Sequence, residues 1–104
     1  MIKSATVTDL HQWLQSGEVV LVDVREPEEW AQGHIAGATH IPLATVAADK
    51  MPSFQGKKLV MQCRSGGRSR TACGILTQSI SGLDIYNLEG GIIAWVQAGY
   101  EVKV

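Results

Sequence analysis

The segment Lys58-Leu59-Val60-Met61-Gln62-Cys63-Arg64-Ser65-Gly66-Gly67-Arg68-Ser69-Arg70 gives the clearest indication of how this chain folds. Its first five residues are mostly apolar and predict a central strand, which places Cys63 at its carboxyl end. After the loop, apolar residues recur at helical spacing as far as Gly82, which predicts a helix. A strand, a glycine-rich loop and a helix in this order are typical of an α/β domain with a largely parallel sheet.

The rest of the chain alternates strand-like and helix-like segments in the same way. The mostly β-branched run at residues 19–24 is typical of a strand that is buried on both faces. Thr8 is expected to cap the first helix, which ends at Gly17. Together these patterns predict one α/β domain over residues 1–104, with a five-stranded, mostly parallel central sheet and helices on both faces. The further predicted elements are strands at 5–7, 39–41 and 84–88, and helices at 8–17, 27–33, 43–52 and 90–99.

The composition is that of a folded globular domain, since 45% of the 104 residues are hydrophobic and 18% are charged. No apolar run approaches the roughly 18 residues that a membrane span needs, and the first residues lack an apolar signal core. We therefore expect a cytoplasmic protein with no membrane partner. Of the two cysteines, Cys73 falls within a predicted helix and is expected to be structural. No spacing of Cys63, His34 and His40 matches that of metal ligands, so no metal is expected.

Charge is unevenly distributed along the chain, although the net charge is only −1. Residues 50–83 contain six of the nine basic residues and no acidic residue, so this block carries +6 and the remaining residues carry −7. A near-neutral chain with no basic run and only 6% aromatic residues is a poor candidate for nucleic-acid binding. Because the positive block includes the cysteine segment, a small anionic substrate fits it better.

The loop after the predicted central strand has the composition of an anion cradle around a nucleophile. Arg68 and Arg70 stand where a helix begins, although a helix N-terminus favours acidic residues, so a bound anion would explain them. Gly66 and Gly67 allow successive N–H groups to turn inward as an anion nest. In such surroundings the pKa of a cysteine falls to roughly 3.5–7.5, so Cys63 is expected to ionise readily. Ligands of open parallel sheets also bind beyond the carboxyl ends of the strands, where Cys63 is predicted to lie.

Several residues near this loop have two interpretations. Arg70 can be an anion ligand or a solvated helix residue. Ser65 and Ser69 can donate hydroxyl hydrogen bonds to the sulfur or cap the helix, and Ser69 is favoured as the cap. Asp23 and Arg25 can belong to the active site, but a buried ion pair that braces the loop is favoured.

Three separated motifs stand in order along the chain. They are LVDVREP at 21–27 with GHIAGA at 33–38, CRSGGRS at 63–69, and LEGGIIAW at 88–95. With these motifs the chain resembles a single-domain rhodanese, of the thiosulfate sulfurtransferase family, over nearly its whole length. The resemblance implies a rhodanese-like three-layer sandwich. The chain departs from the family pattern at Glu101, where many relatives have proline, and this departure affects only the tail.

The resemblance also implies a reaction. The Cys63 thiolate attacks the outer sulfur of thiosulfate, sulfite leaves, and the resulting persulfide passes its terminal sulfur to a thiophilic acceptor such as cyanide or a cellular thiol. No metal or other cofactor is implied beyond that covalent persulfide. The expected partners are a small anionic sulfur donor and a thiol or thioredoxin-like acceptor, for a protein that is a monomer or a weak homodimer.

The physical needs of this cycle assign roles within the loop. Arg64 and Arg68 are expected to clamp the sulfonate-like end of the donor, because a guanidinium offers forked hydrogen bonding. The N–H groups of residues 64–68 are expected to hold the persulfide anion. The complete substrate-binding set is Arg64, Ser65, Gly66, Gly67, Arg68 and Ser69, with Asp23, Arg25 and Arg70 as supporting residues behind it.

Two other functions remain as alternatives. Phosphatases of this architecture, and the related arsenate reductases, separate the cysteine and the arginine by five residues. Here four residues separate Cys63 from Arg68, Ser69 occupies the phosphatase arginine position, and Gln62 stands where those enzymes usually have histidine. A sulfur-relay or binding module that serves a partner protein would keep the persulfide chemistry but turn over free thiosulfate poorly.

Overall fold

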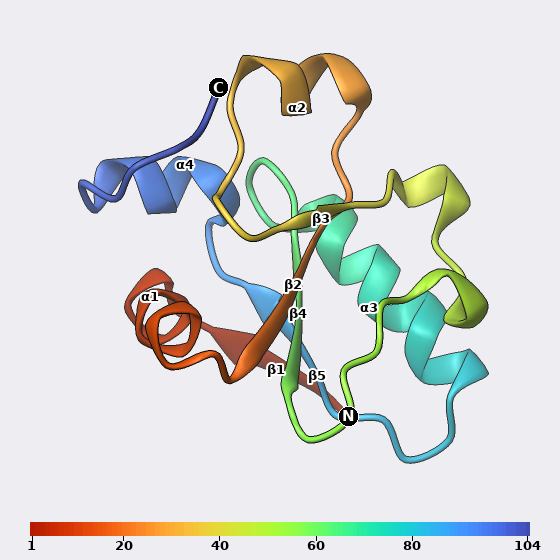
Figure 1. The fold of residues 1–104 in the computed structure, drawn as a ribbon. Helices are drawn as coiled ribbons and strands as arrows, with labels where there is room; N and C mark the ends of the chain where they lie inside the picture. The colour runs from red at the N-terminus through yellow and green to blue at the C-terminus, as the bar shows by residue number, and fades with distance from the viewer.

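The computed structural model describes residues 1–104 and places five parallel strands in one sheet, in the order β1-β5-β4-β2-β3 (Figure 1). The strands are β1 (Ile2–Ala5), β2 (Val19–Asp23), β3 (Thr39–His40), β4 (Lys58–Gln62) and β5 (Ile85–Leu88). The helices are α1 (Val7–Ser16), α2 (Pro27–Gln32), α3 (Gly67–Ser79) and α4 (Gly91–Gln97), with two 3-10 turns, η1 (Leu43–Thr45) and η2 (Ala48–Lys50). The predicted α/β class and five-stranded sheet are confirmed, and the sheet is parallel throughout.

Helices cover both faces of the sheet and make three layers. α1 and α4 pack on one face, whereas α3 and the two 3-10 turns pack on the other (Figure 1). Successive side chains of a strand point to opposite faces, so β4 serves both cores. Leu59 and Met61 belong to the core under α3, and Val60 belongs to the core under α1 and α4.

The sheet order places the candidate site at the carboxyl end of the central strand. β4 lies between β5 and β2, and the loop from Cys63 to Gly66 follows its carboxyl end. The short helix α2 lies beyond the carboxyl ends of the strands, on the same side of the molecule as this loop (Figure 1). Residues that follow β2, β4 and β5 therefore converge on one region.

The start of α1 differs from the prediction. Thr6, and not Thr8, caps the helix: the Asp9 amide donates to Thr6 Oγ1 at 3.0 Å and the Thr6 amide donates to Asp9 Oδ2 at 3.1 Å. This reciprocal capping box needs an acidic or amide side chain three residues after the cap, which Thr6 has in Asp9 and Thr8 lacks. The first strand consequently ends at Ala5, before most of the predicted residues 5–7.

The predicted helix at 43–52 is two 3-10 turns instead. Val46 and Ala47 have extended backbone conformations between η1 and η2. Val46 is 9% exposed and belongs to the core under α3, so its burial interrupts the helical path. The segment therefore packs on the sheet as two separate turns and not as a continuous helix.

The C-terminal residues return to the loop after α2. His34 and Lys103 exchange two backbone hydrogen bonds, of 2.8 and 2.7 Å, in an isolated antiparallel bridge. The Trp95 indole also donates to the Glu101 carbonyl at 2.8 Å, which fastens the tail to α4. None of the helices has both the length and the apolar character that crossing a membrane requires.

Candidate active site

The backbone of the Cys63 loop is fixed by the start of α4. The amide of Ile92 donates to the Cys63 carbonyl at 3.0 Å, and the amide of Ile93 donates to the Arg64 carbonyl at 3.2 Å. Gly91 has a φ of +58°, and a Cβ at this position would lie 2.4 Å from the Arg64 carbonyl oxygen. Only glycine allows this close approach. The Gly91 of the third motif therefore lets α4 begin directly against the backbone of the cysteine loop.

The sulfur of Cys63 lies inside the loop and accepts hydrogen bonds from it. The Gly66 amide donates to Cys63 Sγ at 3.1 Å and Ser69 Oγ lies 3.3 Å from it, while Cys63 as a whole is 1% exposed. Burial by itself would raise the pKa of this thiol, but hydrogen bonds from the Ser69 hydroxyl and from the Ser69, Gly66 and Ser65 amides outweigh it and lower the pKa below its usual value. The loop therefore favours a thiolate.

Ser69 is not the helix cap that the sequence favoured. Gly66, with a φ of +115°, occupies the cap position, and Ser69 is fully buried in the first turn of α3. Its hydroxyl faces the sulfur because a residue three positions after the cap lies over the start of the helix. Ser69 therefore has the alternative role, in which its hydroxyl hydrogen-bonds to the sulfur of Cys63.

Asn87 is a site residue that the sequence analysis missed. It lies on β5, is 7% exposed, and its Oδ1 accepts a hydrogen bond from Ser69 Oγ. Its Nδ2 donates to the Gly66 carbonyl at 3.2 Å. Asparagine is depleted in strands, so an asparagine within an otherwise apolar strand could have indicated a functional position. Because the Ser69 hydroxyl carries one proton, Asn87 Oδ1 competes with the sulfur for it.

Arg68 is not the free anion clamp that was expected. Its Nη1 and Nη2 donate to the two carboxylate oxygens of Glu29 on α2, at 2.6 and 2.9 Å. The Arg68 guanidinium lowers the pKa of Glu29 to about 2, against a smaller effect of burial. The excess positive charge at the start of α3 is therefore balanced partly by a carboxylate of the protein itself.

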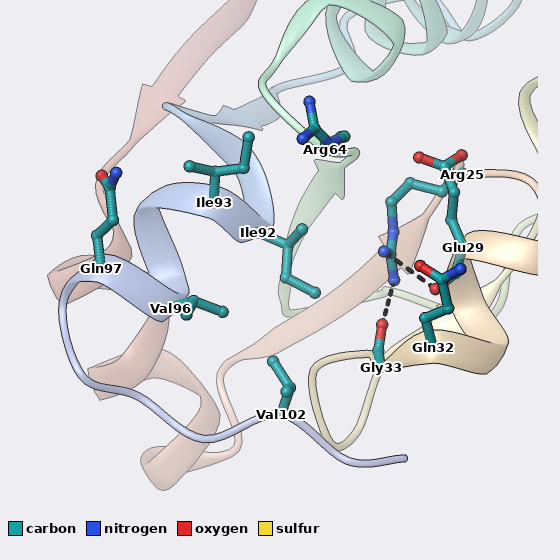
Figure 2. Close-up of a pocket in the computed structure, with 10 residues that line it drawn as sticks. All are labelled: Arg25, Glu29, Gln32, Gly33, Arg64, Ile92, Ile93, Val96, Gln97 and Val102. Atoms are coloured by element: carbon teal, nitrogen blue, oxygen red, sulfur yellow. Dashed lines mark hydrogen bonds between the residues drawn. The ribbon is translucent and has the colours of Figure 1, made fainter.

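Arg64 remains available at the mouth of the loop. Its side chain is exposed and forms no ion pair, and it borders a cavity of about 370 Å³ between α2, α4 and the tail (Figure 2). The remaining residues around the cavity are Arg25, Glu29, Gln32, Gly33, Ile92, Ile93, Val96, Gln97 and Val102. Arg70 is also exposed without an ion pair, but it does not border this cavity.

Asp23 and Arg25 form a buried ion pair, with Arg25 Nη2 donating to Asp23 Oδ2 at 2.8 Å. The guanidinium also donates to the Glu29 carbonyl at 3.3 Å and to the Gly33 carbonyl at 2.7 Å (Figure 2). The pair thus braces the middle and the carboxyl end of α2, and it forms no hydrogen bond with residues 63–66, the loop that it was expected to brace. It sets the position from which Glu29 reaches Arg68.

The two cysteines should differ sharply in alkylation. Burial raises the pKa of Cys73 to about 12, whereas the pKa of Cys63 is lowered, so Cys63 has the larger thiolate fraction at any given pH. We expect iodoacetamide to modify Cys63 about 100-fold faster than Cys73 at pH 7, measured by peptide mass mapping over time. Equal rates, or faster labelling of Cys73, would contradict the electrostatic description of the loop.

Comparisons with known proteins identify the family of this chain. The model of the Rhodanese-like domain matches residues 6–98. A protein of Allochromatium vinosum named sulfurtransferase is 38% identical over 103 residues, which cover 98% of this chain and 95% of that protein. An uncharacterized protein of Synechocystis is 42% identical over 90 residues, 86% of this chain, and the chain spans half of that protein's length.

Solved structures show the same fold. A rhodanese-related protein of Thermoplasma volcanium has a TM-score of 0.81 and 33% identity, with 97% of each chain covered. A Rhodopseudomonas palustris protein, described as a possible tyrosine phosphatase, has a TM-score of 0.81 and 30% identity, covering 98% of this chain and 85% of that one. The family model covers most of the chain, including the cysteine loop, α2 and α4. The chain therefore belongs to the rhodanese-like domain family.

Proposed function

We propose that this protein transfers sulfane sulfur through a persulfide on Cys63, with thiosulfate as a donor and cyanide or a cellular thiol as acceptor. The observation that carries the proposal is the position of the Cys63 sulfur inside the loop, where hydrogen bonds from the Gly66 amide and the Ser69 hydroxyl lower the pKa of the thiol. Membership of the family and the relative named sulfurtransferase support sulfur transfer in general.

The first step exchanges one S–S bond for another. The Cys63 thiolate attacks the terminal sulfur of thiosulfate, the S–S bond of thiosulfate breaks, and sulfite leaves with the electron pair. Because Cys63 is 1% exposed, the donor has to present a single terminal sulfur to the loop. The exposed guanidinium of Arg64 offsets the repulsion between the two anions as they approach.

The second step returns the enzyme to its thiolate. A nucleophilic acceptor attacks the outer sulfur of the persulfide, which gives thiocyanate from cyanide or a new persulfide from a thiol, and Cys63 leaves as the thiolate. The same donors that lower the pKa of Cys63 stabilise it as a leaving group. Because Cys63 leaves this step as the thiolate, the next cycle can begin without a general base.

The test is incubation with thiosulfate and cyanide, with thiocyanate measured against a Cys63→Ser variant. Intact-mass measurement after thiosulfate alone should show one added sulfur atom. Loading from a persulfide-bearing donor protein without turnover of thiosulfate would favour the sulfur-relay alternative. Hydrolysis of an aryl phosphate would instead support the phosphatase alternative, which the four-residue spacing between Cys63 and Arg68 disfavours.

We also propose a reduced thiol or a thioredoxin-like protein as the physiological acceptor, in the cytoplasm, acting on a monomer or weak homodimer. Both cysteines are free, which suits a compartment that keeps thiols reduced. Rates with cyanide, glutathione and reduced thioredoxin, compared at equal concentration, would rank the acceptors. Sedimentation of the protein would measure its oligomeric state.

Ser69→Ala should raise the pKa of Cys63 and move the pH–rate profile to higher pH. The hydroxyl is one of the donors that lower this pKa, and a hydrogen bond to a charged group contributes about 1.5–3 kcal/mol. We expect persulfide formation at pH 7 to slow about 10-fold, with recovery at pH 9. Ser65→Ala is the control, because the Ser65 side chain is exposed and only its amide acts on the sulfur. An unshifted profile in Ser69→Ala would contradict this role.

A further inference from the structure

The carboxylate of Glu29 is held at the start of α3, the helix that follows the cysteine loop. Its Oε1 accepts from Arg68 Nη1 at 2.6 Å and from the Glu26 amide at 3.0 Å, and its Oε2 accepts from Arg68 Nη2 at 2.9 Å. Three donors thus hold one carboxylate between α2 and α3. The pKa of about 2 keeps this group charged throughout the physiological range.

The backbone of α2 around Glu29 is also held in place by hydrogen bonds. Arg25, whose charge is balanced by buried Asp23, donates to the backbone carbonyls of Glu29 and Gly33. These bonds fasten the helix that carries the carboxylate. The carboxylate is therefore fixed on Arg68 and cancels the charge of that guanidinium.

Glu29 also borders the cavity beside the loop, opposite an apolar wall. Figure 2 shows Glu29 and Arg25 on one side, Ile92 and Val96 of α4 on the other, and Arg64 near the loop. Arg25 is balanced by Asp23, and Arg68 outside the cavity is balanced by Glu29. One unpaired positive charge, that of Arg64, is left to face an incoming ligand.

From this arrangement we propose that Glu29 is a specificity-determining residue, which disfavours a donor with two negative charges and favours a singly charged sulfane-sulfur donor that bears an apolar group. This inference rests on the proposed function and deepens it. One unpaired guanidinium matches one anionic charge, and the apolar wall formed by Ile92, Ile93, Val96 and Val102 suits an alkyl group. Thiosulfate is then used, but less efficiently than such a donor.

Methanethiosulfonate is a matched probe for thiosulfate. The Cys63 thiolate attacks its terminal sulfur, the S–S bond breaks, and methanesulfinate leaves with the electron pair, so the bond exchange is the same. The two donors differ in that a methyl group replaces one anionic oxygen. The ratio of kcat/KM for thiosulfate to kcat/KM for methanethiosulfonate, with cyanide as acceptor, therefore isolates the response to the second charge.

Glu29→Gln should raise this ratio about 10-fold, because it removes a nearby charge that repels the dianion more than the monoanion and frees the Arg68 guanidinium. Added salt should reduce the difference between the variant and the wild type. Glu28→Gln is the control: it makes the same charge change on the same helix, but its side chain is exposed and does not touch Arg68. The control should leave the ratio unchanged.

The outcomes separate the inference from the proposed function. If Glu29→Gln lowers kcat/KM equally for both donors, Glu29 only positions Arg68 and the specificity role is overturned. Glu29→Asp keeps the charge and should keep the low ratio; a raised ratio in this variant would also overturn the role. If neither donor adds sulfur to Cys63 in the wild type, as measured by intact mass, the proposed function itself fails.

Discussion

Substitution of Cys63 by Ser is expected to lower thiocyanate formation from thiosulfate and cyanide by roughly 10³-fold or more. A hydroxyl cannot form a persulfide, and its far higher pKa leaves no nucleophile for the terminal sulfur of the donor. The measurement is the initial rate of thiocyanate formation, together with intact mass after thiosulfate, which should show no added sulfur. The Gly66 and Ser69 donors can also hydrogen-bond a serine oxygen, so the variant should remain folded.

Cys73→Ser makes the same substitution away from the loop. Cys73 is fully buried in α3, and its Sγ lies 3.6 Å from the Tyr86 carbonyl, where a hydroxyl can also donate. We expect this variant to keep activity within about twofold at a modest cost in stability. A comparable loss of activity in both variants would refute the assignment of a single reactive sulfur.

Asp23→Ala should produce the largest loss of stability among single substitutions near the site. It leaves the Arg25 guanidinium 6% exposed without its counter-charge, and breaking a buried pair in this way costs about 3–5 kcal/mol. Urea or thermal unfolding measures the loss. Persulfide formation in the folded fraction should also change, because Arg25 positions α2 and hence Glu29.

Two controls distinguish the buried charge from a general effect of substitution. Asp49→Ala removes an exposed aspartate that forms no ion pair, and should change the free energy of unfolding by no more than about 0.5 kcal/mol. The double variant Asp23→Leu with Arg25→Met removes both charges and should recover much of the lost stability. A loss below about 1 kcal/mol in Asp23→Ala would show that water reaches Arg25 and that the pair does not support α2.

The central strand, the cysteine loop and the following helix could be predicted because their signals are local. An apolar run, two glycines and a helical repeat lie within about twenty consecutive residues, and each specifies its own backbone. The cap of the first helix was misplaced by two residues, since Thr6 and Thr8 are both suitable caps and only the reciprocal bond to Asp9 decides between them.

The side-chain partners of the loop could not be predicted, because they are distant in sequence. Arg68 pairs with Glu29, which is 39 positions away, and Ser69 contacts Asn87, which is 18 positions away. A basic residue at a helix start indicates an anion but does not say whether that anion is a substrate or a side chain of the protein. The cavity beside Arg64 likewise forms only when α2, α4 and the tail meet.

The backbone bridge between His34 and Lys103 has a practical consequence for laboratory work on this domain. An affinity tag or fluorescent reporter attached after Val104 would lie next to Lys103 and could disturb its bridge to His34 at the end of α2. Val102, in the same tail, also borders the cavity. The amino group of Met1 instead lies 3.8 Å from Asp84, at the amino ends of the parallel strands and away from Cys63. Purification handles and labels for kinetic assays should therefore be attached in front of Met1.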